Sequence, residues 1–289
     1  MSKRAFLIVM DSLGIGNAPD AKMFGDEGSD TLLSISKSDK FNMPNMQKMG
    51  FFNIDDISLE SVEHPQGSFA RIQEKSNGKD TTIGHWEIMG IESEKPLPTF
   101  PDGFPEDFLN EFSQKTGYKC ICNKAYSGTE VLKDYAKQSV KDGALIVYTS
   151  ADSVFQVAAH EEVISVEKLY NACEIARGML TGSLAVGRVI ARPFVGDEVK
   201  GYTRTARRHD FSILPPDKTL LDFLCKNGKK TIGVGKIYDI FAGQGIDETF
   251  KTANNSDGMQ KTMEIAKTDF EGLCFVNLVD FDMVYGHRN

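Results

Sequence analysis

The densest group of reactive side chains in the sequence lies at residues 78–87, where the chain reads GKDTTIGHWE. A threonine hydroxyl is a weak nucleophile, so Thr81 would need a neighbouring base or metal ion to activate it. Asp80 has the residue type of a helix N-cap, which predicts a helix that begins near Thr81. The free N–H groups at such a helix N-terminus would stabilise a phosphate on that threonine. A capped helix with a surface histidine explains the same residues about as well.

Acidic residues follow the first and the last apolar runs of the sequence. Asp11 follows the first run, and Asp282 and then His287 follow the last. Functional groups in open α/β sheets gather beyond the carboxyl ends of the strands. Carboxylate and imidazole together suit Mn²⁺ or Zn²⁺. These residues therefore predict a metal site, with a turn at Asp11 and a polar loop near the C-terminus as the alternatives.

Arginine residues recur in the middle of the chain, and two of them lie in apolar surroundings. These are Arg188 and Arg192, where a charge without a partner would be costly, so we expect an anion beside them. Phosphate suits the planar guanidinium group, although for any single arginine a solvated surface charge is the alternative. Thr149 and Ser150 follow another apolar run, and their hydroxyls are candidates for lining the same cleft.

Composition excludes several classes of protein. The chain has 289 residues, 40% hydrophobic and 26% charged, which rules out a collagen-like or wholly disordered protein. A net charge of −8 argues against a nucleic-acid partner but leaves room for a small anion in a local basic pocket. No apolar run approaches the ~18 residues of a membrane span, so we expect no membrane partner. Five cysteines without disulfide spacing, and no signal peptide, predict a cytoplasmic protein with reduced thiols.

Short apolar runs bounded by polar or glycine residues predict strands, and apolar stripes at helical spacing predict helices. Because the apolar runs are nearly continuous, we expect strands that are buried on both faces in a parallel sheet covered by helices. The predicted strands are 5–10, 144–148, 188–194, 231–234 and 273–279, and the predicted helices are 165–180, 218–225 and 256–267.

Two proline-rich stretches mark candidate domain boundaries. They lie at residues 95–105 and 215–216, where proline stiffens a connection and ends helices. We therefore expect an outer domain formed by residues 1–99 and 215–289. Residues 100–214 would form a second domain inserted into it.

Six blocks of the sequence occur together in the order in which one known family has them. They read FLIVMDSLGIG, GKDTTIGHWEIMG, YTSADSVFQVAAHEE, GRVIARPFVGD, RHDFS and VDFDMVYGHR. Together they resemble the phosphopentomutase family of the alkaline phosphatase superfamily, over residues 5–288. The resemblance implies an α/β fold, with an alkaline-phosphatase-like core sheet flanked by helices and an inserted α/β cap domain. It also implies two metal ions, usually Mn²⁺, and phosphoryl transfer between O5 and O1 of ribose or 2-deoxyribose through a phosphothreonine.

The resemblance assigns roles to residues that match the family's motifs. Thr81 matches the nucleophile, and Asp11 matches a ligand of the metal ion that also contacts the threonine. Asp282 and His287 match two ligands of the other metal ion. The residues that match positions holding the sugar phosphate are Ser150, Arg188, Arg204 and Lys236.

Members of the family continue beyond the GHR motif into a stretch that carries further metal ligands, whereas this sequence ends at Asn289. We therefore expect a truncated form with an incomplete metal site and an exposed edge of the core sheet. Another phosphatase or mutase of the same superfamily is one alternative, although the cap motifs favour the pentose mutase. A non-catalytic fragment that binds sugar phosphates is the other.

Overall fold

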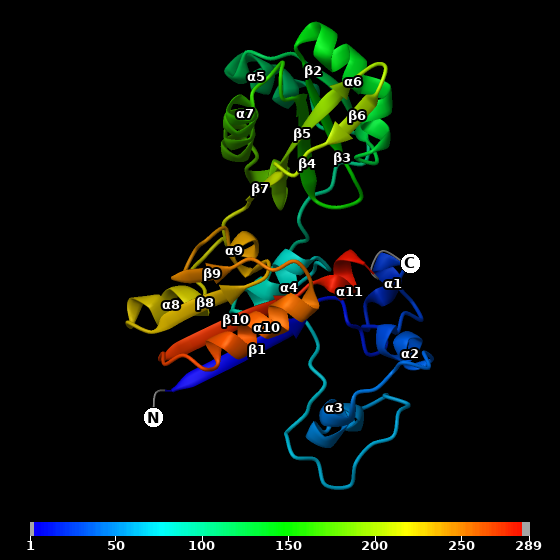
Figure 1. Cartoon of the computed structure of the whole chain (residues 1–289), viewed down its shortest axis with the longest axis vertical. Helices are drawn as coiled ribbons and strands as arrows, with labels where there is room; N and C mark the ends of the chain where they lie inside the picture. The colour runs from blue at the N-terminus through cyan, green and yellow to red at the C-terminus, as the bar shows by residue number, and fades with distance from the viewer. Residues whose placement is uncertain (1–2, 285–289) are drawn as a thin grey trace. The chain divides into compact units, whose positions relative to one another are not determined.

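The computed structural model describes residues 3–284, which form two compact units (Figure 1). The outer unit comprises the N-terminal residues up to Ser93, Thr219–Tyr238 and the residues from Gly245 onward. The inserted unit comprises Glu94–Lys218 and Asp239–Gln244. The division into a core and a functional cap, with boundaries at 99/100 and 214/215, stays a prediction. Among the described helices, none has the length and apolar character needed to cross a membrane.

The outer unit is built on a parallel sheet with the strand order β1-β10-β8-β9. Helix α10 packs against β10, and apolar residues such as Ile265, Val234 and Val276 form the core between them. Helix α8 lies beside β8. The strands are β1 (Arg4–Met10), β8 (Lys230–Val234), β9 (Glu248–Phe250) and β10 (Gly272–Leu278), and the two helices are α8 (Leu220–Lys226) and α10 (Asn255–Ile265).

Strand β1 differs from the expectation that its apolar run would be buried on both faces. Among the described strands it pairs only with β10, and none of its residues is fully buried. Ile8, for example, is 41% exposed. An apolar run indicates that a strand is suited to burial, but whether it is buried depends on neighbouring elements from other parts of the sequence. The prediction that β1 is buried on both faces was therefore wrong.

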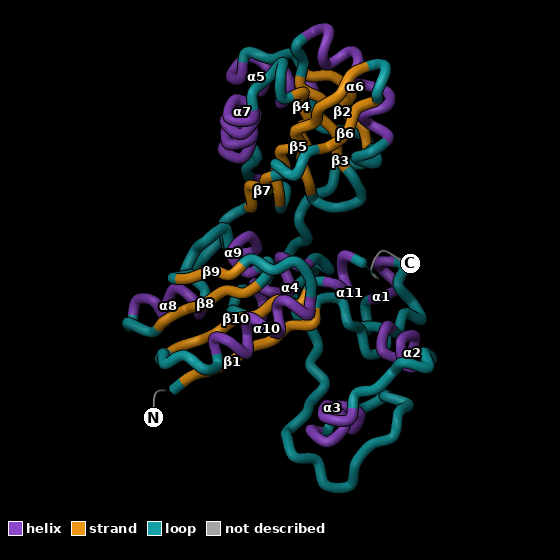
Figure 2. Tube along the Cα trace, in the orientation of Figure 1, coloured by secondary structure: helices purple, strands orange, loops and turns teal. Residues whose placement is uncertain are grey.

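Short helices and a long irregular segment complete the outer unit (Figure 2). The segment between η1 and α4 contains no helix or strand, and the side chain of Asn53 exchanges two hydrogen bonds with the backbone of Val62. Arg71 donates to the carbonyl of Ile15 at 2.9 Å, which ties the segment to the loop after β1. The short elements are α1 (Ala21–Phe24), α2 (Thr31–Ser36), α3 (Pro44–Met49), η1 (Phe51–Asn53), α4 (Thr81–Ile88) and α11 (Asp280–Met283), together with the first half of α9 (Ile237–Ile240).

The inserted unit has a sheet with the order β2-β3-β4-β5-β6, and β7 also pairs with β5. Alternate residues of β3 point to opposite faces: Leu145 and Val147 join a core with α5 and α7, whereas Ile146 and Tyr148 join a core with α6. The strands are β2 (Cys120–Ala125), β3 (Leu145–Thr149), β4 (Val154–His160), β5 (Arg188–Asp197), β6 (Gly201–Arg204) and β7 (His209–Ser212). The helices are α5 (Glu106–Thr116), α6 (Glu130–Asp142), α7 (Val166–Met179) and the short η2 (Gly182–Leu184).

The α/β fold class and all the predicted strands and helices are confirmed, within a few residues at their ends. The five cysteines are free, as expected. The expectation of a parallel sheet holds for the outer unit but is wrong for the inserted one, where β3 and β4 are antiparallel. Only residues 150–153 connect these two strands, and a parallel crossover needs about a dozen residues.

Candidate functional site

Thr81 and Asp11 meet in the outer unit although they are far apart in the sequence. Asp11 directly follows β1 and is held there by a 3.0 Å hydrogen bond from its N–H to the carbonyl of Leu278. Thr81 is the first residue of α4, and its hydroxyl lies 3.2 Å from Oδ2 and 3.4 Å from Oδ1 of Asp11. Asp11 is only 6% exposed, whereas Thr81 is half-buried. The hydroxyl of a half-buried threonine therefore faces a buried carboxylate.

Asp80 is the N-cap of α4, which confirms the predicted start of this helix. Its carboxylate accepts hydrogen bonds from the N–H groups of Thr82 at 2.9 Å and Ile83 at 3.0 Å. The expectation that N–H groups of this helix terminus are free to bind a phosphate is therefore wrong for these two, because the cap itself occupies them.

Glu87 anchors the segment that leads into Thr81. Its carboxylate accepts hydrogen bonds from the backbone N–H groups of Lys75 and Ser76, both at 2.8 Å. Burial on its own would raise the pKa of Glu87, but the hydrogen bonds from Ser76 and Lys75 outweigh it and leave the pKa below its ordinary value. A carboxylate on α4 thus fixes the chain just before the nucleophile candidate.

Asn277 connects Asp11 to His85, although no motif in the sequence pointed to it. Its Nδ2 atom lies 3.0 Å from Oδ2 of Asp11 and 3.2 Å from Nε2 of His85. Because Nδ2 is a donor, Nε2 of His85 accepts, and Nδ1 donates to the carbonyl of Thr81 at 2.7 Å. Burial lowers the pKa of His85 against the opposing effect of Asp11, which favours this neutral form. The available signal was a lone polar residue inside the last apolar run.

Asp282 lies on α11, near the end of β1. The hydroxyl of Ser12 donates to its Oδ1 atom at 3.4 Å, and Nζ of Lys236 lies 3.9 Å from its Oδ2 atom. Ser12 adopts a left-handed conformation with φ of 64°, which few residues other than glycine adopt. Asp280, in contrast, accepts a hydrogen bond of 2.9 Å from the backbone N–H of Asn255 and has a local structural role. The remaining predicted ligand, His287, lies outside the described residues.

Lys236 follows Gly235 at the carboxyl end of β8. Gly235 has φ of 77°, and a Cβ atom there would lie 2.4 Å from the carbonyl oxygen of Asn277. Only glycine permits this close approach of the two backbones. Lys236 therefore lies at the carboxyl end of β8, with its Nζ atom 3.9 Å from the carboxylate of Asp282.

Residues 3–284 contain no group of three or more His, Cys, Asp or Glu side chains arranged to hold a metal ion. The donors that they do supply are oxygen atoms of Asp11, Thr81 and Asp282, which suit a hard divalent cation. Within the described chain, Asp11 forms no ion pair, and a buried carboxylate without a counter-charge is costly. The electrostatics of Asp11 therefore fit a bound cation beside it.

The other predicted substrate-binding residues lie in the inserted unit. The hydroxyl of Ser150 accepts a hydrogen bond from the N–H of Asp152 at 3.3 Å. Arg188 lies 3.7 Å from the carboxylates of both Asp152 and Asp210. Arg204, at the end of β6, forms no ion pair with any residue that the structure describes. Arg188 thus has two carboxylates near it within the unit, whereas Arg204 has no ion pair among the described residues.

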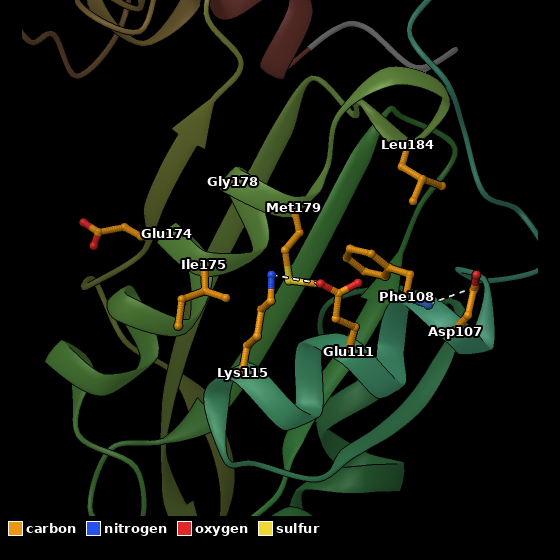
Figure 3. Close-up of a pocket in the computed structure, with 9 residues that line it drawn as sticks. All are labelled: Asp107, Phe108, Glu111, Lys115, Glu174, Ile175, Gly178, Met179 and Leu184. Carbon is orange, nitrogen blue, oxygen red and sulfur yellow. Dashed lines mark hydrogen bonds and ion pairs between the residues drawn. The ribbon is translucent and has the colours of Figure 1, made fainter.

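A groove on the inserted unit lies between α5 and α7 (Figure 3). Lys115 and Glu111, both on α5, form an ion pair of 2.8 Å beside it, and Phe108 and Met179 contribute apolar surface. None of the predicted site residues that the structure describes lines this groove. It is therefore separate from both groups of residues described above.

Comparison with known proteins identifies a family model, described as the metalloenzyme superfamily, that matches residues 3–289. Three similar proteins, each named phosphopentomutase, come from Lachnoclostridium phytofermentans, Clostridium novyi and Thermotoga maritima, with identities of 60%, 55% and 52%. The aligned region covers 99–100% of this chain and 74% of each of these relatives.

Proposed function

The chain belongs to the phosphopentomutase family within the metalloenzyme superfamily, and we propose that it transfers a phosphoryl group between O1 and O5 of a pentose through Thr81. Such an enzyme is an isomerase. The observation that carries the role of Thr81 is the 3.2 Å contact between its hydroxyl and the buried carboxylate of Asp11. A hydroxyl beside a buried carboxylate that has no ion pair among the described residues is an arrangement that suits an activated nucleophile.

In the proposed reaction, the Thr81 oxygen loses its proton and bonds to phosphorus, while the bond from phosphorus to one pentose oxygen breaks and that oxygen takes up a proton. In the return step, the other pentose oxygen loses its proton and bonds to phosphorus, while the bond from phosphorus to Thr81 breaks and the threonine hydroxyl is restored. Asp11 faces the Thr81 hydroxyl at Oδ2 and orients it. Asn277 holds Asp11 by donating to the same carboxylate, so that the nucleophile keeps one orientation through both steps.

The family requires a metal cofactor, and we propose that it is Mn²⁺. Asp11 and Thr81 would hold one ion, and Asp282 and His287 would contribute to a second. Bound cations would neutralise the charge of the transferring phosphoryl group. The buried carboxylate of Asp11, without an ion pair among the described residues, supports a cation at this position.

The proposed substrate is a phosphorylated ribose or 2-deoxyribose. Arginine and lysine bind phosphate through charge-assisted hydrogen bonds, and we assign this role to matched positions of the family. The residues are Ser150, Arg188, Arg204 and Lys236. The inserted unit would then be the cap predicted for residues 100–214. We further propose a cytoplasmic location, with no nucleic-acid or membrane partner, in keeping with the net charge of −8.

The test is interconversion of ribose 1-phosphate and ribose 5-phosphate by the purified protein with Mn²⁺. We expect turnover that a chelator abolishes and that added Mn²⁺ restores. Preference for phosphoglycerate over ribose 5-phosphate would instead assign the chain to another mutase of the superfamily. Binding of ribose 5-phosphate without turnover would support the non-catalytic alternative.

A further inference from the structure

The segment that leads into Thr81 is held by the opposite end of the helix that Thr81 begins. Glu87 lies near the C-terminal end of α4, and Thr81 lies at its N-terminal end. Oε1 of Glu87 accepts a hydrogen bond from the N–H of Lys75, and Oε2 accepts one from the N–H of Ser76, both at 2.8 Å. The carboxylate and residues 75–76 therefore close a loop of chain that contains Thr81.

Ser76 connects this carboxylate to a third segment of the chain. It is 4% exposed, and its Oγ atom accepts a hydrogen bond from the N–H of Ser93 at 2.9 Å. The N–H of Asn77 donates to the carbonyl of Ser93, also at 2.9 Å. Burial raises the pKa of Glu87, but hydrogen bonds from the Ser76 side chain and from the N–H groups of Lys75 and Ser76 lower it more. The carboxylate therefore stays charged, and charged acceptors form stronger hydrogen bonds than neutral ones.

The C-terminal end of α4 is also attached to the chain where it leaves and re-enters the outer unit. Ser93, which contacts Ser76, is the last residue before the chain enters the inserted unit. The chain returns at Thr219, and the N–H of Leu220 donates to the carbonyl of Met89 at 2.9 Å. Met89 is the C-cap of α4 and is 2% exposed. The helix that carries the nucleophile candidate at one end is therefore fixed, at its other end, to both of these segments.

Two further contacts of the segment before Thr81 hold it less firmly. Lys79 forms an ion pair with Asp26, but the lysine side chain is 54% exposed, and exposed ion pairs contribute little to stability. The carboxylate of Asp80 caps α4 itself, so it moves together with the start of the helix. The contacts of Ser76 and Glu87 are therefore stronger attachments of residues 75–80 than these two.

We propose that Ser76 and Glu87 are positioning residues for Thr81, because they hold residues 75–80 in the path that presents the threonine hydroxyl to Asp11. A displacement of this segment would move the hydroxyl relative to the carboxylate oxygen that lies 3.2 Å from it. Small errors in the alignment of reacting groups reduce a reaction rate strongly. That Thr81 is the group to be positioned rests on the proposed function, whereas the contacts of Ser76 and Glu87 rest on the geometry.

The first test compares the steady-state kinetics of Ser76→Ala and Glu87→Gln with two matched controls. Ser93→Ala is one control, because Ser93 contacts this segment through backbone atoms that the substitution keeps. Glu92→Gln is the other, because it removes an exposed carboxylate that pairs with the side chain of Lys75 at 3.2 Å. We expect kcat to fall by about tenfold or more in the two test variants, with KM for ribose 5-phosphate within about twofold of the wild type. Both constants should stay within about twofold in the controls.

Hydrogen exchange of the backbone amides tests the same contacts without relying on turnover. We expect residues 80–84 to exchange about fivefold faster or more in Ser76→Ala and Glu87→Gln, because the start of α4 loosens with the segment before it. The two controls should exchange as the wild type does. Denaturant unfolding shows which variants are folded, and if Glu87→Gln is not, Ser76→Ala decides alone because it removes a single hydroxyl.

The proposal is overturned if the folded test variants keep the wild-type kcat, even when they lose stability, because the two residues would then have only a structural role. It is also overturned if residues 80–84 exchange at the wild-type rate in these variants. Faster exchange in the test variants, in a protein whose wild type shows no mutase turnover, would support the contacts of Ser76 and Glu87 and contradict the proposed function alone.

Discussion

The side-chain amide nitrogen of Asn277 lies 3.0 Å from the carboxylate of Asp11, and this contact links the two strands that carry the candidate site. Asn277 belongs to β10, and Asp11 directly follows β1, its parallel neighbour. The same nitrogen also reaches His85, whose other ring nitrogen donates to the carbonyl of Thr81. The orientation of Asp11 and the start of α4 are therefore linked through one buried side chain.

Replacing Asn277 should reduce turnover more than substrate binding. The Asn277→Leu substitution keeps the number and branching of the side-chain heavy atoms, but Asp11 and His85 lose their shared donor. We expect kcat to fall by about tenfold to a hundredfold, with a smaller change in KM, because misorientation of catalytic groups acts mainly on the reaction step. Steady-state kinetics would measure this. Asn227→Leu, at the end of α8, is the control, and a wild-type kcat for Asn277→Leu would rule out the positioning role.

The close approach of two backbones at Gly235 should make this position intolerant of a side chain. Gly235→Ala places a Cβ atom 2.4 Å from the carbonyl of Asn277 at a φ of 77°, so β8 and β10 must separate. We expect a loss of stability of about 1–3 kcal/mol and reduced activity. Gly178→Ala in α7, with nothing within 4 Å of the new atom, should instead stabilise the protein by about 0.5–1 kcal/mol. Equal changes in the free energy of unfolding for the two variants, measured by chemical denaturation, would contradict this account.

The core of the inserted unit depends on Phe155. Its ring makes edge-to-face contacts with Phe104, Phe108 and Phe112, at centroid distances of 4.8, 5.5 and 5.4 Å. Phe155→Ala should cost about 3–5 kcal/mol of stability through lost contacts and a cavity. Phe223→Ala, where the side chain is mostly exposed, should cost far less. Denaturant unfolding of both proteins measures the difference, and similar losses would show that the cluster is not central to stability.

The buried thiols should make the protein less stable at alkaline pH. Burial raises the pKa of Cys274 to about 12, and it raises the pKa of Cys173 as well. In an unfolded chain these thiols ionise near pH ~8.5, so the unfolded state loses protons first as the pH rises. The buried, protonated thiols therefore contribute fully to the free energy of unfolding below that pH, and their contribution declines as the pH rises above it. We expect falling stability above pH ~9 and slow alkylation of both thiols until denaturant is added; rapid alkylation of the native protein would contradict this.

The positions of strands and helices could be predicted from the sequence better than their burial and their pairing. The apolar runs located five strands, and Asp80 located the start of α4, because strand burial and helix capping are local signals. The exposure of β1 and the antiparallel pairing of β3 with β4 depend on neighbours and on connection length. The family motifs assign Thr81 and Asp11 to one site, and the two side chains are in contact, whereas their roles stay predictions. The sequence motifs did not include Asn277, because its importance lies in contacts with Asp11 and His85 that a single apolar run does not reveal.

The most direct test of the central claim is detection of a phosphoryl group on Thr81. The protein would be incubated with Mn²⁺ and ribose 5-phosphate, quenched, and analysed by peptide mass spectrometry, with ribose 1-phosphate measured in parallel. We predict phosphorylation at Thr81, complete loss of turnover in Thr81→Ala, and retained turnover in Thr82→Ala, its neighbour on the same helix. Turnover that persists in Thr81→Ala, or a phosphoryl group on another residue, would contradict the proposed role of Thr81.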